Sequence, residues 1–297
     1  AAENGDKELC EFLIEEGADV NAEDEDRRTA LIYAAENGDK ELCEFLIEEG
    51  ADVNSKRVTG WTALIYAAEN GDKELCELLI EKGVDVNATT RCGSTALLHA
   101  VENGHKEVCH LLIEKEADVN AVDKDGWTAL MIAALKGHKE VCELLIEKGA
   151  DVNAVEKDGS TALMSAAGSG NKEVCEFLIE KGSDVNAVGK YGSTALMSAA
   201  RSGNKEVCEF LIEKGADVNS VDKDGLTAFM GAAENGHKEV CELLIEKGAD
   251  INAIDKYGRT ALVEAASRGN KELCEFLIEK GADINAVKKD EMTALMS

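Results

Sequence analysis

The sequence predicts an all-α repeat solenoid, and three observations carry this prediction. Each 33-residue period holds the same order of segments, from Thr-Ala-Leu through a glycine to Lys-Glu-Val-Cys-Glu-Leu-Leu-Ile-Glu or a close variant. The 297 residues are 44% hydrophobic and include no proline, which favours helices. A fixed period of this length is typical of stacked units. Nine of the ten cysteines mark the period: Cys10, Cys43, Cys76, Cys109, Cys142, Cys175, Cys208, Cys241 and Cys274.

Each repeat is expected to begin with a short helix. Thr128 can cap a helix that runs through Leu135, because its hydroxyl can accept a hydrogen bond from an orphan backbone N–H. Gly137 can then adopt the left-handed conformation that ends this helix. The pattern predicts an equivalent first helix in the other repeats.

A second helix is expected to start at His138 or at its equivalents Asp39 and Asn171, with Glu140 near the positive end. The apolar residues between positions 141 and 146 cover about 200° of this helix at about 100° per residue. An arc that wide needs neighbours on two sides. Each unit is therefore expected to be stable only when it is stacked on others.

The connecting segments complete the repeat. Asp-Lys-Asp-Gly segments such as 222–225 are expected to form turns between helix pairs. Gly-Ala-Asp-Val-Asn-Ala, or a near variant, closes the repeats. Together with the period, these segments resemble the ankyrin repeat, which implies helix–turn–helix units with β-turn or hairpin connections. The family's Thr-Pro-Leu-His is replaced by Thr-Ala-Leu and an apolar residue, so apolar packing is expected at Ile32, Ile65, Leu98, Met131, Met164, Met197 and Val263.

The period predicts one solenoid over residues 1–297, with partial repeats at 1–22 and 287–297. Both ends fall inside the first helix of a repeat, and neither carries the polar cap that solenoid ends need. We therefore expect a segment of a longer array whose natural N-terminus is not shown, or ends that another chain covers.

Charge limits the choice of partners. The sequence has 32 Lys and Arg residues against 60 Asp and Glu residues, a formal net charge of −28. Such a chain repels phosphate backbones, so nucleic acid is not expected as a partner. No stretch approaches the roughly 20 apolar residues of a membrane-spanning helix, so no membrane is expected either.

The cysteines are expected to pack in the core. Equivalent sites in stacked repeats lie about 8–10 Å apart, beyond the reach of a disulfide. No Cys-x-x-Cys or His-x-x-x-His spacing indicates zinc, so neither metal nor cofactor is predicted. Many free thiols favour the cytoplasm or another reducing intracellular compartment. Cys92 lies in a turn, where a reactive thiol and a neutral substitution both remain open.

The sequence does not predict an enzyme, because no nucleophile, base and pocket coincide. His105, His138 and His237 stand where other repeats have Asp or Asn, which favours a capping or turn role.

A protein partner of unknown identity is expected, since the resemblance implies binding through the turn tips and the concave surface of the first helices. The variable positions there are large in the N-terminal half and small or polar in the C-terminal half. Aromatic and arginine side chains are favoured at interfaces, although the same side chains can instead pack between neighbouring helices. The predicted contact residues are Tyr33, Tyr66, Trp61, His99, Trp127, Ile132, Arg27, Arg28, Arg57 and Arg91.

The second helices also predict an acidic stripe opposite their apolar arc, which only His110 interrupts. Such a stripe keeps a protein soluble or attracts a basic partner. At its centre lie Glu44, Glu77, Glu143, Glu176, Glu209, Glu242 and Glu275.

The repeat over 90–120 departs most from its siblings. Glu116 replaces the glycine that ends the second helix elsewhere, and a non-glycine residue in a left-handed conformation costs about 1–2 kcal/mol. We expect a weakened or reshaped joint there, and a hinge, a contact and simple drift all remain open.

A non-catalytic protein-binding scaffold is thus the leading hypothesis. The alternative is a structural protein whose similar repeats self-associate end-to-end or laterally into a fibre.

Overall fold

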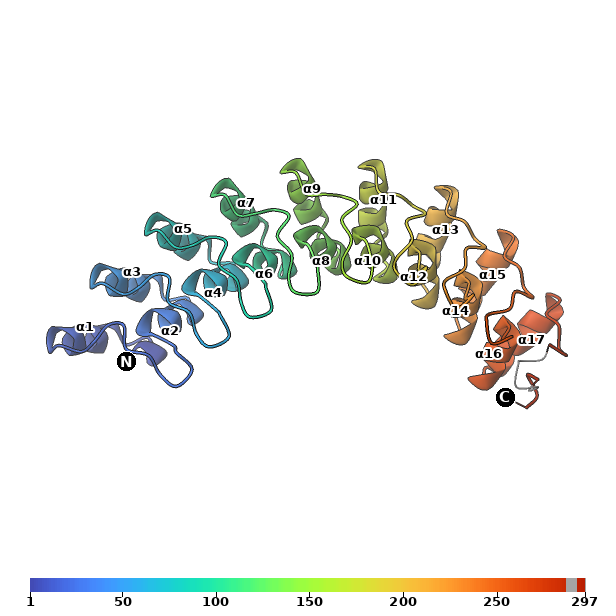
Figure 1. Cartoon of the computed structure of the whole chain (residues 1–297), viewed down its shortest axis with the longest axis horizontal. Helices are drawn as coiled ribbons and strands as arrows, with labels where there is room; N and C mark the ends of the chain where they lie inside the picture. Colours follow the sequence, from blue (N-terminus) through green and yellow to red (C-terminus); the bar gives the residue numbers. More distant parts are fainter. Residues whose placement is uncertain (287–292, 297) are drawn as a thin grey trace. The chain divides into compact units, whose positions relative to one another are not determined.

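The computed structural model describes residues 1–286 and 293–296. Its helices alternate between two kinds along the chain, and the two helices of a repeat lie side by side (Figure 1). The first helices are α2 (Ala30–Glu36), α4 (Ala63–Asn70), α6 (Ala96–Glu102), α8 (Ala129–Lys136), α10 (Ala162–Gly168), α12 (Ala195–Arg201), α14 (Ala228–Glu234) and α16 (Ala261–Ser267). The second helices are α1 (Lys7–Glu15), α3 (Lys40–Glu48), α5 (Lys73–Glu81), α7 (Lys106–Glu114), α9 (Lys139–Glu147), α11 (Lys172–Glu180), α13 (Lys205–Glu213), α15 (Lys238–Glu246) and α17 (Lys271–Glu279), and a 3₁₀ turn over Ala2–Asn4 precedes α1.

The chain divides into two compact units. Unit 1 comprises residues 1–133 and 140–151, and unit 2 comprises residues 134–139 and 152–297. Within unit 1, α2, α4 and α6 pack in series and each contacts its own second helix; α10, α12, α14 and α16 do the same in unit 2. The predicted C-terminal partial repeat lies outside the described residues except for 293–296.

Threonine caps and glycine stops define the first helices, as the sequence predicts. The Thr128 hydroxyl accepts a hydrogen bond from the Met131 N–H at 3.2 Å, and Thr62 accepts one from Ile65 at 3.3 Å. Gly137 has a φ of 77°, in the left-handed region. Six of the seven apolar residues that replace the family's histidine are buried, with Ile32 and Ile65 fully so, and Met197 is partly exposed.

The start of the second helix is stabilised in two ways. Asp39 and Asp72 accept the N–H three residues on and cap their own helices, which confirms the capping prediction there. Of the two roles predicted for His105 and His237, side-chain capping is wrong, because neither side chain caps its helix, although both residues stand at the N-cap position. Their Nε2 atoms lie 3.0 Å from the carbonyl oxygens of Glu69 and Arg201 instead. Asn171 and Asn204 likewise donate to backbone carbonyls in the first helix of the preceding repeat.

A second set of bonds joins consecutive repeats through the closing asparagine. Asn21 Nδ2 donates to the carbonyl of Gly50 at 3.0 Å, and Asn21 Oδ1 accepts from the N–H of Asp52 at 2.7 Å. The same pair of bonds recurs from Asn54, Asn87 and Asn120 in unit 1, and from Asn186, Asn219 and Asn252 in unit 2.

The turns form short hairpins that are tied to one another. In unit 1 the Asp123 N–H donates to the Trp127 carbonyl at 3.1 Å, and Val122 and Thr128 form an isolated antiparallel bridge. The tips of neighbouring hairpins are joined by backbone bonds such as Lys124 N to Cys92 O at 2.8 Å. No longer strand occurs in residues 1–286. The described structure thus confirms stacked helix pairs with hairpin connections.

Two non-glycine residues among those described adopt the left-handed conformation. Glu116 does so as the sequence indicates, with a φ of 68°. The expected reshaping is wrong, because the Glu116 carbonyl still accepts the Asn87 side chain at 3.1 Å. Arg27, with a φ of 61°, was not anticipated, although it stands where the next repeat has Gly60.

Replacing Glu116 with glycine should stabilise the protein by about 0.5–1 kcal/mol, because the backbone strain removed exceeds the extra entropy of an unfolded glycine. The midpoint of urea-induced unfolding measures this. Gly149→Ala is the matched control: Gly149 has a φ of 95° and open space around its α-carbon, so alanine adds strain without a clash and should lower the midpoint. An unchanged midpoint for Glu116→Gly contradicts the strain.

Cysteine burial predicts selective thiol chemistry. Of the nine cysteines that mark the period, which we call the ladder cysteines, eight are buried and Cys274 is partly exposed. Burial raises the pKa of thiols such as Cys43 and Cys241 to about 12. Cys92 is exposed. With Ellman's reagent at pH 8, the folded protein should therefore show one fast-reacting thiol. Cys92→Asp, which introduces the residue found in sibling turns, should remove that fast phase, and its persistence would show that a ladder cysteine is accessible.

Candidate functional site

The predicted contact residues other than Arg27 and Arg91 belong to a triplet of positions that recurs in the repeats. It consists of the first turn residue, the residue before the capping threonine and the fourth residue of the first helix. In the first such repeat these are Asp24, Arg28 and Tyr33. The Tyr33 hydroxyl donates to Asp24 Oδ2 at 2.9 Å, Arg28 Nε donates to the same oxygen at 3.0 Å, and the guanidinium lies 4.5 Å from the ring centroid. Hydrogen bonds led by the Arg28 backbone N–H lower the pKa of Asp24 to about 2.

The next repeat builds an aromatic cluster, which we define as Arg57, Trp61, Tyr66 and His99. Trp61 lies 4.7 Å from Tyr66 and 4.6 Å from His99 between ring centroids, in tilted geometries. Arg57 Nη1 donates to the Tyr66 hydroxyl at 2.7 Å. Tyr66 is buried at 6% exposure, whereas the other three are partly exposed. The cluster therefore both packs between repeats and presents a surface.

Buried polar atoms in this cluster lack partners. Arg57 Nε and His99 Nε2 are covered and make no hydrogen bond. Burial lowers the pKa of His99 and raises that of Tyr66, so both rings are neutral at pH 7. An unsatisfied buried polar group costs about 1–3 kcal/mol, and groups of this kind often mark functional positions.

The remaining predicted residues are not members of the aromatic cluster. Trp127 and Ile132 form the triplet of a later repeat with Asp123 and are each partly exposed. Arg27 is exposed and pairs with Glu23 at 2.9 Å. Arg91 is exposed at a hairpin tip, where its backbone N–H donates to Thr59.

The same triplet in unit 2 holds an ion-pair network that the sequence reasoning missed. Arg259 contacts Asp255 at 2.6 Å and Glu264 at 2.8 Å. Both acids are buried, at 4% and 7% exposure. Asp255, Arg259 and Glu264 occupy the same three positions of their repeat as the triplets of unit 1. Aligning the repeats is therefore the sequence signal that could have found this network. Here the side chains at the variable positions form ion pairs with one another instead of facing the solvent.

The acidic stripe lies on the outer face of the second helices. Glu44, Glu209 and Glu275 are exposed and the other four central glutamates are partly exposed. Some are paired within their own helix, as in Lys172–Glu176 at 3.9 Å and Lys271–Glu275 at 3.4 Å. These exposed pairs reduce the free negative charge of the stripe.

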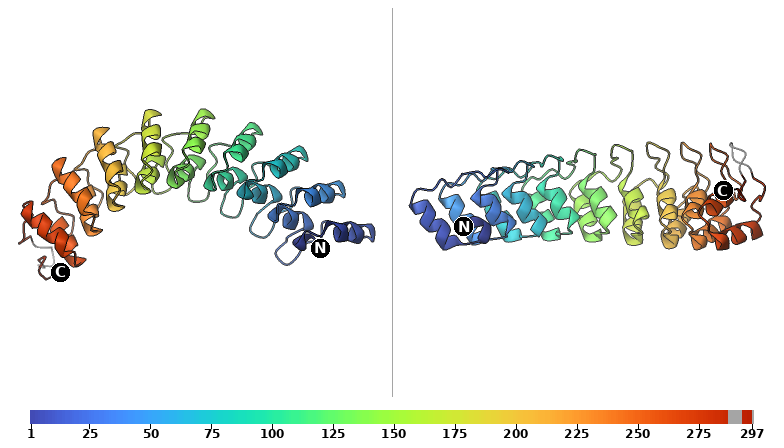
Figure 2. Two further views of the ribbon diagram at one scale, coloured as in Figure 1. Left: turned by 180° about the vertical axis from the view of Figure 1, so that it is seen from behind. Right: turned by 90° about the horizontal axis from the view of Figure 1, so that it is seen from below.

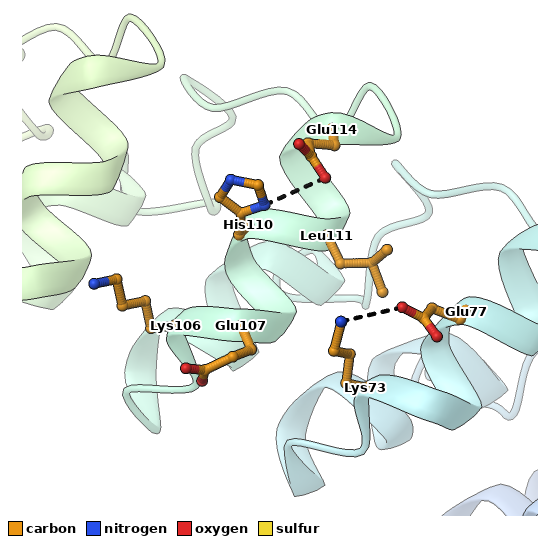
Figure 3. Close-up of a pocket in the computed structure, with 7 residues that line it drawn as sticks. All are labelled: Lys73, Glu77, Lys106, Glu107, His110, Leu111 and Glu114. Carbon is orange, nitrogen blue, oxygen red and sulfur yellow. Dashed lines mark ion pairs between the residues drawn. The ribbon is translucent and has the colours of Figure 1, made fainter.

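His110 lies in a shallow groove between α5 and α7, with a volume of about 270 Å³. Figure 3 shows His110 turned toward Glu114, with Nδ1 3.2 Å from a carboxylate oxygen, and Lys73 turned toward Glu77 at 3.3 Å. These charges are substantially exposed and already paired, so the groove offers no activated acid or base. It is lined by Lys73, Glu77, Lys106, Glu107, His110, Leu111 and Glu114.

The described residues contain no group of three or more His, Cys, Asp or Glu side chains that could hold a metal ion. Among the same residues, no helix has the length and apolar character needed to cross a membrane.

The lowered pKa of His99 predicts a pH dependence of stability. Below about pH 6.5 the unfolded chain binds a proton at this residue before the folded chain does, so stability should fall as the pH drops. His99→Ile introduces the residue found at position 132 and should remove this component. Urea unfolding between pH 7.5 and 5 measures the difference, and identical pH profiles for both proteins contradict the assignment.

The repeat pattern agrees with comparison to known families. A family model described as ankyrin repeats in three copies matches residues 1–90, 85–156, 153–222 and 217–288. No curated protein matches the sequence. Because the matches cover nearly the whole chain and the structure has the corresponding helix pairs, this chain belongs to the ankyrin-repeat family.

Proposed function

We propose that this chain is a non-catalytic scaffold that binds a protein partner through the turns and first helices of unit 1. Ankyrin repeats are generally protein-interaction scaffolds and are typically non-catalytic. The observation that carries the proposal is the aromatic cluster, in which Trp61, His99 and Arg57 stay partly exposed while Tyr66 is buried beneath them. Aromatic and arginine side chains held in place by packing are the residue types that dominate interface energies.

The partner segment should carry a carboxylate beside an apolar or aromatic side chain. Arg91 is exposed at a hairpin tip of the same unit, and the Arg57 side chain is partly exposed in the aromatic cluster. A carboxylate can accept a bidentate pair of hydrogen bonds from a guanidinium. The net charge of −28 repels acidic segments from most of the chain, so arginine-bearing turns are where such a segment binds best.

Selection of peptides from a random phage-displayed library on the full chain tests this proposal. Enriched peptides should combine Asp or Glu with an aromatic or aliphatic residue. Trp61→Ser with Arg91→Glu should weaken their binding by about tenfold or more, since a hot-spot side chain and a charge partner are both lost. Both substitutions introduce residues that sibling repeats carry, at Ser160 and Glu25.

The matched control is Leu226→Ser with Lys223→Glu, at the equivalent positions of unit 2, and it should leave the affinity unchanged. Binding should also weaken as salt rises from 50 to 500 mM, a range chosen to shorten the screening length severalfold. Equal affinity of both double variants, or enrichment of peptides without acidic residues, would refute this site.

A further inference from the structure

Unit 2 exposes a row of aliphatic side chains, which we call the apolar row. It consists of Val155, Val188, Val221 and Ile254, one in each of four successive repeats. Their side chains are 60%, 65%, 58% and 65% exposed. Each follows the Asn-Ala or Asn-Ser pair that closes a repeat, at the base of the next hairpin.

The fold does not require apolar residues at these positions. The equivalent positions of the first three repeats hold Glu23, Lys56 and Thr89. These repeats form the same hairpins and the same helices. The four exposed aliphatic residues of unit 2, like Val122 at the equivalent position of unit 1, which is 50% exposed, are therefore unexplained by folding. Exposed apolar side chains that recur from repeat to repeat favour an interaction site.

Backbone hydrogen bonds hold the row in place. The residue after each row member closes its hairpin, as in Gly189 N to Ser193 O at 2.9 Å and Asp222 N to Leu226 O at 2.9 Å. The tips of neighbouring hairpins are joined by Lys190 N to Asp158 O at 2.7 Å and Lys223 N to Tyr191 O at 2.8 Å. Figure 2 (right) shows the loops of unit 2 side by side along one edge. The row is thus an ordered surface.

Charge near the row is balanced, in contrast to the outer helices. Lys190 pairs with Asp158 at 3.6 Å, and Lys256 pairs with Asp224. Tyr191 and Tyr257 are 56% and 49% exposed on the same hairpins. The neighbourhood therefore suits an uncharged segment with apolar side chains, whereas a second copy of this chain would bring another net charge of −28.

The spacing of the row selects the conformation of that segment. Packed helices of neighbouring repeats lie about 8–10 Å apart, so row members follow at about that interval. A polyproline II segment presents every third residue on one face, at about 9 Å. An extended β-strand presents residues of one face at intervals of about 6.6 Å, which is shorter than the interval between row members. An α-helix matches at about 10.5 Å per seven residues, but its apolar stripe is wider than a single row of side chains.

We infer that the apolar row of unit 2 binds an uncharged, extended segment of a partner protein in the polyproline II conformation, with an aliphatic residue or proline at every third position. Exposed tyrosines beside the row fit this occupant, because polyproline II segments dock on aromatic surfaces. The site is separate in residues and in chemistry from the arginine-bearing surface of unit 1.

Fluorescence anisotropy of a labelled peptide with four Val-Pro-Ser triplets, titrated with the full chain, tests the inference. This peptide should bind at least about tenfold more tightly than a peptide of the same composition with the valines at irregular spacing. The double variant Val188→Thr with Val221→Thr should weaken binding by about tenfold or more. Raising the salt to 0.5 M, the highest concentration in the test of the unit 1 site, should not weaken binding, because apolar contacts are not screened. Thr89 already occupies this position in unit 1, so the fold accepts threonine.

Leu135→Glu is the matched control, because it removes an exposed apolar residue away from the row and introduces the residue found at Glu36 and Glu102. It should leave binding unchanged. Equal binding of the irregular peptide, preference for an amphipathic helical peptide, or full binding by the valine double variant would each overturn the inference. Dimers in sedimentation velocity that the valine double variant abolishes would assign the row to a second copy and overturn it as well. None of these outcomes depends on Trp61 or Arg91.

Discussion

The side chain of the closing asparagine is the interaction on which the rest of the structure depends. In unit 1, Asn21 bonds both the Gly50 carbonyl and the Asp52 N–H of the next repeat. That carbonyl follows the end of a helix, where the last carbonyl groups have no partner within the helix. One amide side chain therefore satisfies two backbone groups and fixes the position of the next repeat. Its recurrence in both units explains why the period does not slip, since an inserted residue would break both bonds.

Because the asparagines and the buried helix faces fix the stacking, the turn triplets are free to differ. The same three positions form a partly exposed aromatic cluster at Arg57, Trp61 and Tyr66, in which Tyr66 is buried, and an ion-pair network at Arg259 with Asp255 and Glu264. Burying two carboxylates around one guanidinium contributes little net stability once desolvation is counted. The network therefore does not explain the fold, and its main effect is to turn polar groups inward.

The sequence predicts the helices well because their signals are local. Threonine caps, glycine stops and the cysteine period all act within a few residues, and Thr128, Gly137 and Cys142 behave as expected. Contacts between repeats are harder to predict. An Asn or His at the start of a second helix can cap that helix or reach the preceding repeat, and the choice seen at His105 depends on a distance that the sequence does not contain. Arg27 was predictable from its alignment with Gly60.

The sequence names the residue types at the candidate surface but does not indicate how exposed each of them is. Tyr66 and Tyr33 occupy equivalent positions, yet Tyr66 is buried and packs against Trp61, whereas Tyr33 stays partly exposed beside Arg28. Likewise, Val188 and its equivalents look like ordinary core valines in the sequence, and only the hairpin geometry leaves them in water. The two surfaces differ in their physics, since charge-assisted bonds weaken as salt screens them and apolar contacts do not. A family defined by its buried positions can therefore accommodate the two unlike surfaces proposed for this chain, because neither alters the residues that stack the repeats.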